Sequence, residues 1–263
     1  MSSRLSALPL CIGIVALGAC AKEVPIVEVA GECADVFSGR LCTWARMQGD
    51  SVIDAGVTVP LSVIEGAPAD HAMTWPPTNS AILSLPAAAQ AGSGMLHMTF
   101  LWESMGHPPG PFLTPHFDFH FYTVNQAARD AMDCVDSSKP AATPAGYALP
   151  DLALPPPMVA MTGVDTLIGL CVPKMGMHAL LDSEMQATNP FRGTMVLGYY
   201  AGKPIFIEPM LSKAMLLEKA PFELPIPSIP EMPGNYPRAF RAEFNPEQQS
   251  YRFVFSGFAP GAD

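Results

Sequence analysis

The segment 115–122, "PHFDFHFY", constrains the fold of this chain more than any other stretch. Polar and aromatic side chains alternate in it, and alternate residues of a β-strand lie on opposite faces. One face carries three phenylalanines, Phe117, Phe119 and Phe121. The other face carries four polar side chains, His116, Asp118, His120 and Tyr122. The pattern predicts a strand whose aromatic face enters a core and whose polar face lies against solvent or a lined cavity.

Other strand candidates surround this segment. The apolar run 95–103, "MLHMTFLWE", precedes it across a proline-rich loop, and we expect the two strands to pair. The segments 193–200 and 203–210 predict a hairpin around Ala201-Gly202. The segments 239–244 and 250–258 alternate in the same way and predict a last hairpin.

Helical candidates are few and short. They are limited to "QAARDAMDC" (126–134) and "SKAMLLEK" (212–219), and residues 139–157 form a proline-rich connection. We therefore expect a mainly β fold, α+β at most. It is an antiparallel sandwich or barrel with long Pro-rich loops and one or two short helices.

The N-terminal 19 residues predict a lipoprotein signal peptide. An apolar run at 8–18 is too short to span a bilayer, and it ends in "LGAC", with small residues before Cys20. This pattern resembles the bacterial lipobox, in which the cysteine is lipidated and becomes the mature N-terminus. An ordinary cleaved signal is the alternative. We expect a lipid anchor on the periplasmic face of a bacterial membrane, a tether and small N-terminal module over 20–60, and a β-rich domain over 61–263.

Export leaves four cysteines to pair in an oxidising compartment. Cys33 and Cys42 close a short local loop, so we expect them to form one disulfide. Of the three possible pairings, this one leaves Cys134 and Cys171 to form the other disulfide, and four buried free thiols are the alternative.

Composition bears on partners. Charged residues make up 14% of the chain and hydrophobic residues 49%, so much apolar surface must be covered, and a homo-oligomer is expected. The net charge of −10 argues against a nucleic-acid partner, because phosphate binding needs a basic face.

The polar face of the 115–122 strand predicts a metal site. His116 and His120 lie about 13 Å apart on a flat strand, too far to bind one ion together. Other segments must therefore contribute ligands, and His178 after a glycine turn and Glu208 in an apolar strand are the candidates. We expect at least three of five residues to converge in one cavity: His116, Asp118, His120, His178 and Glu208. His107 is expected at the rim, and Tyr122 as a supporting donor.

Imidazole and carboxylate ligands suit zinc, manganese or iron(II). Copper is the alternative, because Met175 and Met177 lie close to His178 in sequence. Glu208 could also act as a general base. Without a metal, His116 and Asp118 form the solvent-exposed face of an amphipathic strand, and Glu208 pairs with Lys203 or Arg192.

Five segments together resemble a little-characterised bacterial family. They are "GHPPGPFLTPHFDFHFY", "AGYALP", "VPKMGMH", "NPFRGTMVLGYYAGKPIFIEPM" and "GNYPRAFRAEF", within residues 95–258. The best-known member of that family is a thermophile protein controlled by an extracytoplasmic stress (sigma-E) system. The resemblance implies a β-rich fold that oligomerises through large interfaces, and it implies no settled activity. Residues 158–170, between the proline-rich connection and "VPKMGMH", look like an insertion into a connecting segment that is shorter in the family.

Two functions are consistent with these features. The first is a lipid-anchored metalloprotein of the cell envelope, with a polar pocket and a metal-dependent enzymatic activity on an unknown substrate. The second is a non-catalytic envelope-stress protein or small-ligand-binding protein without metal.

Overall fold

The computed structural model describes residues 24–70 and 73–261. The predicted signal peptide and Cys20, the predicted lipidation site, lie outside the described residues. Within the described part of the chain, no helix combines the length and the apolar character needed to cross a membrane.

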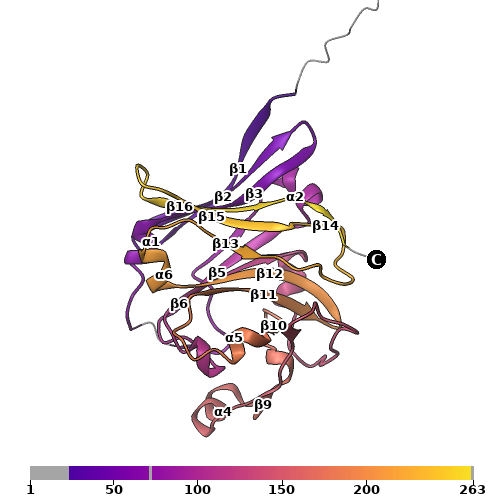
Figure 1. Cartoon of the computed structure of the whole chain (residues 1–263). Helices are drawn as coiled ribbons and strands as arrows, with labels where there is room; N and C mark the ends of the chain where they lie inside the picture. Colours follow the sequence, from indigo (N-terminus) through magenta and orange to yellow (C-terminus); the bar gives the residue numbers. More distant parts are fainter. Residues whose placement is uncertain (1–23, 71–72, 262–263) are drawn as a thin grey trace, which may run out of the picture.

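Two antiparallel sheets face each other and form a sandwich (Figure 1). The first sheet has six strands, in spatial order β1 (Ile26–Val36), β2 (Gly39–Gln48), β3 (Ser51–Pro60), β16 (Ser250–Ser256), β15 (Ala239–Asn245) and β13 (Phe222–Pro225). The second has seven, in spatial order β4 (Ala81–Ser84), β5 (His97–Glu103), β6 (His116–Tyr122), β12 (Lys203–Ser212), β11 (Gly193–Tyr200), β10 (Met177–Leu181) and β7 (Tyr147–Ala148).

Smaller elements join and cover the sheets. Two short strand pairs are present, β8 (Leu152–Ala153) with β9 (Thr166–Leu167), and β14 (Asn235–Tyr236) with β17 (Ala259–Pro260). The described residues contain six α-helices, α1 (Leu61–Glu65), α2 (Ala87–Ser93), α3 (Gln126–Asp130), α4 (Pro156–Thr162), α5 (Asp182–Met185) and α6 (Lys213–Leu217). Two 3₁₀ turns, η1 (Gly110–Phe112) and η2 (Ile168–Leu170), complete the set.

The predicted mainly β, antiparallel fold is confirmed, and it is a sandwich rather than a closed barrel. The predicted pairing of β5 with β6 and the hairpins β11–β12 and β15–β16 are present. More helices occur than the one or two expected. Each has at most seven residues, about two turns, which is too short to produce a recognisable periodic pattern.

The boundary expected at residue 60 does not separate two structural units. Residues 26–60 supply β1, β2 and β3, and residues 54–60 of β3 pair with the whole of β16. The segment expected as a tether and small module is therefore, from residue 26 onward, half of the six-stranded sheet.

Phenylalanines from both sheets form the centre of the core. Phe119 and Phe121 of β6 are fully buried. Their rings lie 4.9 Å from Phe253 and 4.6 Å from Phe255 of β16, measured between centroids. The aromatic face of β6 thus packs against the six-stranded sheet, as its alternation predicts, and its polar face points the other way.

The long chain segment between β6 and β10 covers that other face. In Figure 1 this segment, with α4, β9 and the connections around them, lies below the seven-stranded sheet, on the side away from the six-stranded sheet. The polar face of β6 is therefore enclosed between the sheet and its covering loops, and it is fully buried.

Candidate metal centre

A pocket with a cavity volume of about 90 Å³ lies over the outer face of the seven-stranded sheet. Its floor comes from alternate residues of β5, β6, β12, β11 and β10, and its cover comes from three loops around residues 73–77, 107–109 and 152–175. Most of the lining is apolar and includes Trp75, Pro108, Leu152, Met158, Leu170 and Met210. The polar lining consists chiefly of histidines and carboxylates: Glu103, His107, Asp118, His120, His178 and Glu208.

Three of these side chains converge on the pocket floor. His120, His178 and Glu208 each offer one ligand atom, and the three atoms lie within 4.8 Å of one another. His120 Nε2 is 3.5 Å from Glu208 Oε2. These three residues come from β6, β10 and β12, so the register of the sheet, rather than a flexible loop, fixes their spacing.

A glycine makes room for this arrangement. His178 lies directly opposite Gly198 of β11, and Gly198 lies opposite Phe206 of β12. A side chain at Gly198 would overlap the Phe206 ring, because its Cβ would lie 2.0 Å from that ring. The Phe206 ring instead packs against both histidines, at 4.9 Å from His120 and 5.2 Å from His178 between centroids.

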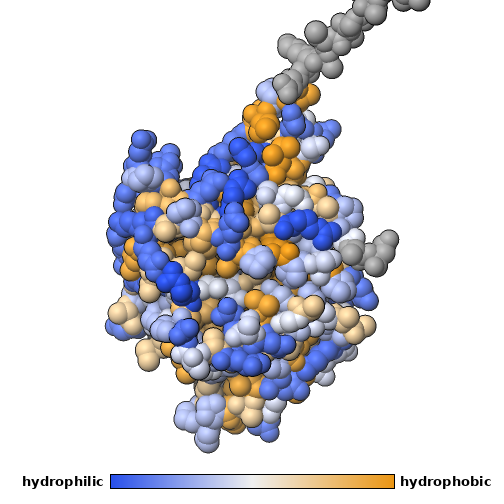
Figure 2. Space-filling model, viewed as in Figure 1, coloured by the Kyte–Doolittle hydropathy of each residue, from blue (hydrophilic) through white to orange (hydrophobic). Residues whose placement is uncertain are grey.

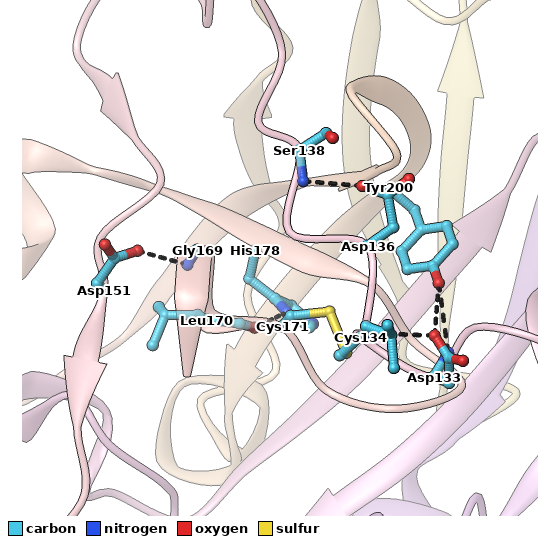
Figure 3. Close-up of a disulfide and its surroundings, with 11 residues drawn as sticks. Asp133, Cys134, Asp136, Ser138, Asp151, Gly169, Leu170, Cys171, His178 and Tyr200 are labelled. Atoms are coloured by element: carbon cyan, nitrogen blue, oxygen red, sulfur yellow. Dashed lines mark hydrogen bonds between the residues drawn. A yellow bond between two sulfur atoms is a disulfide. The ribbon is translucent and has the colours of Figure 1, made fainter. Parts of the chain in front are cut away.

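The Cys134–Cys171 disulfide supports the orientation of His178. His178 Nδ1 donates to the carbonyl oxygen of Leu170 at 2.9 Å, and Leu170 precedes the bridged Cys171 (Figure 3). This hydrogen bond places the proton on Nδ1 and leaves Nε2 with its lone pair, the arrangement found behind most metal-bound histidines. Both expected disulfides, Cys33–Cys42 and Cys134–Cys171, are confirmed.

A second group of the same composition lies beside the first. His107, His116 and Asp118 also offer three ligand atoms within 4.8 Å of one another. His116 and His120 therefore belong to different groups, as the spacing along a strand requires. Asp118 joins His116 rather than His120, and His107, expected only at the rim, completes this second group.

Several atoms of both groups are buried without a hydrogen-bond partner. They are His116 Nε2, Asp118 Oδ1, both ring nitrogens of His120, and Glu208 Oε2. A buried polar atom without a partner costs about 1–3 kcal/mol, more when it is charged. A cation would satisfy lone pairs of nitrogen and oxygen together, so both groups could hold a metal ion.

Burial sets the protonation of these groups. It lowers the pKa of His116 and of His178 to about 4, and burial together with the neighbouring His178 places the pKa of His120 well below its usual range. Neutral imidazole is the form that binds metal. Burial raises the pKa of Asp118 to about 6, and burial with the charge of Asp118 raises the pKa of Glu208 well above its usual value. A cation would displace the proton that Glu208 otherwise holds.

Sequence reasoning missed Glu103. This residue lines the pocket and lies directly across from His116 in the β5–β6 pair. Burial and then the charge of Asp118 raise its pKa to about 8. Aligning the two predicted strands would have placed it on the polar face, since it shares that face with His116.

Other expected residues occupy different positions. The Tyr122 ring stacks between His97 and His120, at 5.0 and 5.8 Å, and does not line the pocket. Arg192 pairs with Glu218 rather than with Glu208. Met175 lines the pocket, whereas Met177 faces the main core.

Comparisons with family models, with curated proteins and with solved structures give no match to this chain. The resemblance carried by the five segments above therefore stays a prediction. Any function assigned to the chain must therefore rest on the site itself. The site consists of two groups, each with two histidines and one carboxylate, that could hold a metal ion.

Proposed function

We propose that this protein is a lipid-anchored protein of the cell envelope that binds a divalent metal ion through His120, His178 and Glu208. The observation that carries this proposal is the convergence of these three side chains, from strands β6, β10 and β12 of one sheet, at the floor of a pocket. Their neutral imidazoles and the unpartnered Oε2 of Glu208 are groups that a cation would satisfy.

The donor set favours zinc, manganese or iron(II). Two histidines and one carboxylate form the protein ligands of many catalytic zinc sites and of non-haem iron sites. Three ligands leave coordination positions open, through which a bound metal polarises a carbonyl group or activates water. Copper is less well supported, because Met177, one of the two thioethers close to His178 in sequence, faces the main core.

Glu208 acts as a ligand in this proposal rather than as a general base. The better placed proton acceptor is Glu103, which lines the same pocket outside both groups. A carboxyl group whose pKa lies near neutrality exchanges a proton readily at physiological pH. The proposed activity is therefore metal-dependent and assisted by Glu103.

The pocket lining limits what reaches the metal. Leucine, methionine, proline and tryptophan side chains form most of it. A substrate or ligand with a small apolar body and one polar group matches this lining. The same lining favours a second candidate function, the non-catalytic binding of a small apolar molecule without metal.

The proposed location rests on two features. Two disulfides are typical of an oxidising compartment outside the cytoplasm. The described chain also begins with exposed apolar residues, Val24, Ile26 and Val27, each at least half exposed. Figure 2 shows hydrophobic surface on the projecting end of the molecule, where Figure 1 places β1. A membrane surface or a second subunit would cover these residues, which agrees with the expected anchor and oligomer.

Titration of the chelator-treated protein with zinc tests the proposal. His178→Ala and Glu208→Gln should each weaken zinc binding by at least 100-fold, measured by competition with a chromogenic chelator. His97→Gln is the matched control, because His97 is a buried histidine of the same sheet that does not line the pocket. Equal zinc affinity in all three variants would overturn the assignment, and binding of an apolar dye by metal-free protein would then favour the second candidate.

A further inference from the structure

The group His107, His116 and Asp118 has an unusual pattern of hydrogen bonds. His116 Nδ1 lies 2.6 Å from the carbonyl oxygen of Thr114, and His107 Nδ1 lies 2.9 Å from the carbonyl oxygen of Pro108. A carbonyl oxygen only accepts, so each Nδ1 carries the proton of its ring. In a neutral imidazole the Nε2 atom then holds a lone pair.

Both of these lone pairs are directed at a carboxylate. His116 Nε2 lies 3.3 Å from Asp118 Oδ1, and His107 Nε2 lies 3.9 Å from Asp118 Oδ2. In an ordinary histidine–aspartate pair, a ring N–H donates to the carboxylate oxygen. Here the only proton of each neutral ring lies on Nδ1 and is donated to a backbone carbonyl, so Nε2 has no proton to donate to Asp118. His116 Nε2 and Asp118 Oδ1 are both buried without a hydrogen-bond partner. Electron-rich atoms thus face one another in a buried place.

The separations match those around a metal ion. Bonds of about 2 Å to nitrogen or oxygen in a tetrahedral site place neighbouring ligand atoms about 3 to 4 Å apart. A backbone carbonyl that accepts from the far ring nitrogen is the usual support of a metal-bound histidine. Two of the three residues, His116 and Asp118, lie on the central strand β6, whose backbone is held by pairing on both sides.

We infer that His107, His116 and Asp118 bind a second divalent transition-metal ion, so that the pocket holds two ions. This site goes beyond the proposed function, which requires only the His120–His178–Glu208 site. Asp118 and His120 are two residues apart on β6, and their attachment points are therefore roughly 6.6 Å apart along the strand. The two ions occupy separate ligand sets, and His107 and Asp118 of the second set line the same pocket as the first set.

Zinc stoichiometry of the full-length protein in detergent tests this inference. The protein is stripped with a chelator, dialysed with zinc alone and analysed for bound metal per chain. Wild-type protein should bind two ions, and His107→Ala should bind one. His107 is suited to this test because it lies in the loop between β5 and β6 and is partly exposed, so the sheet does not depend on it. Asp118→Asn, which keeps the side-chain volume, should also bind one ion.

The variants separate this inference from the proposed function. His178→Ala should retain one ion, and the double variant His107→Ala/His178→Ala should retain none, while His97→Gln keeps both. Two ions in His107→Ala, or a single wild-type ion that His178→Ala removes, would overturn the second site and leave the first. A single ion that His107→Ala removes and His178→Ala keeps would uphold the second site and overturn the first. No bound zinc in wild-type protein would overturn both.

Discussion

Glu103 should make the metal-free protein less stable as the pH rises. Burial and the charge of Asp118 raise the pKa of this carboxyl group from 4.5 to about 8. The folded state therefore keeps a proton that the unfolded state releases above pH 4.5. Because the folded state binds more protons in this range, the free energy of unfolding falls as the pH rises from about 4.5 to 8.

The size of the effect follows from the proton difference. One proton changes the free energy of unfolding by at most about 1.4 kcal/mol per pH unit. Between pH 5.5 and 7.5 the upper bound is therefore about 2.7 kcal/mol. Part of the Glu103 side chain is exposed to solvent. Solvent screening therefore keeps the change in the free energy of unfolding below this bound.

Urea unfolding of Glu103→Gln and wild-type protein measures this difference. Both proteins are unfolded with a chelator present at pH 5.5, 6.5 and 7.5. The other titrating groups are shared, so the difference between the two proteins reports Glu103 together with its interaction with Asp118. We expect the variant to gain stability relative to wild type by 1–2 kcal/mol over this range, within the bound of about 1.4 kcal/mol per pH unit. Glu247→Gln, in an exposed turn, controls for the loss of one surface carboxylate. A constant difference between Glu103→Gln and wild type at all three pH values would refute the reasoning.

Three further predictions concern the disulfides, the assembly and the anchor. Replacing Cys134 and Cys171 with serine should weaken zinc binding by about 10-fold, because the η2 turn, whose Leu170 carbonyl orients His178, is no longer held by the bridge. Serine replacements of Cys33 and Cys42, in the β1–β2 pair, should leave the zinc affinity unaltered. Equal loss of zinc affinity in both double variants would contradict the role of Cys134–Cys171 in orienting His178. Light scattering on the chain without residues 1–20 should give a multiple of the monomer mass; a clean monomer at micromolar concentration would exclude the oligomer. Mass spectrometry of the membrane fraction should find a lipid-modified peptide starting at Cys20, and Cys20→Ala protein that stays in that fraction at the same level would exclude the anchor.

The strands of this fold could be predicted because their patterns have a period of two. The alternation in 115–122 identified the core face of β6, and Ala201-Gly202 identified the β11–β12 turn, where both residues have positive φ. The role of residues 26–60 could not be predicted, since pairing of β3 with β16 joins segments almost 200 residues apart. Local sequence carries no information about such a pairing.

The candidate site was predictable as a set of residues but not as two groups. The distance along β6 separates His116 from His120, yet nothing in the sequence assigns Asp118 to one or the other. That assignment depends on the loop that brings His107 to β6 and on the register that places His178 near Glu208. Glu103 was missed because its role appears only when β5 is aligned with β6.

Elemental analysis of the native protein tests the central claim most directly. The protein is purified without chelator from the cells that produce it, and its metal content is measured per chain. We predict at least one equivalent of zinc, manganese or iron, and one equivalent of this metal is lost in His178→Ala and in Glu208→Gln but kept in His97→Gln. Wild-type protein with less than a tenth of an equivalent of any of these metals, and no uptake when each is added back, would contradict the account.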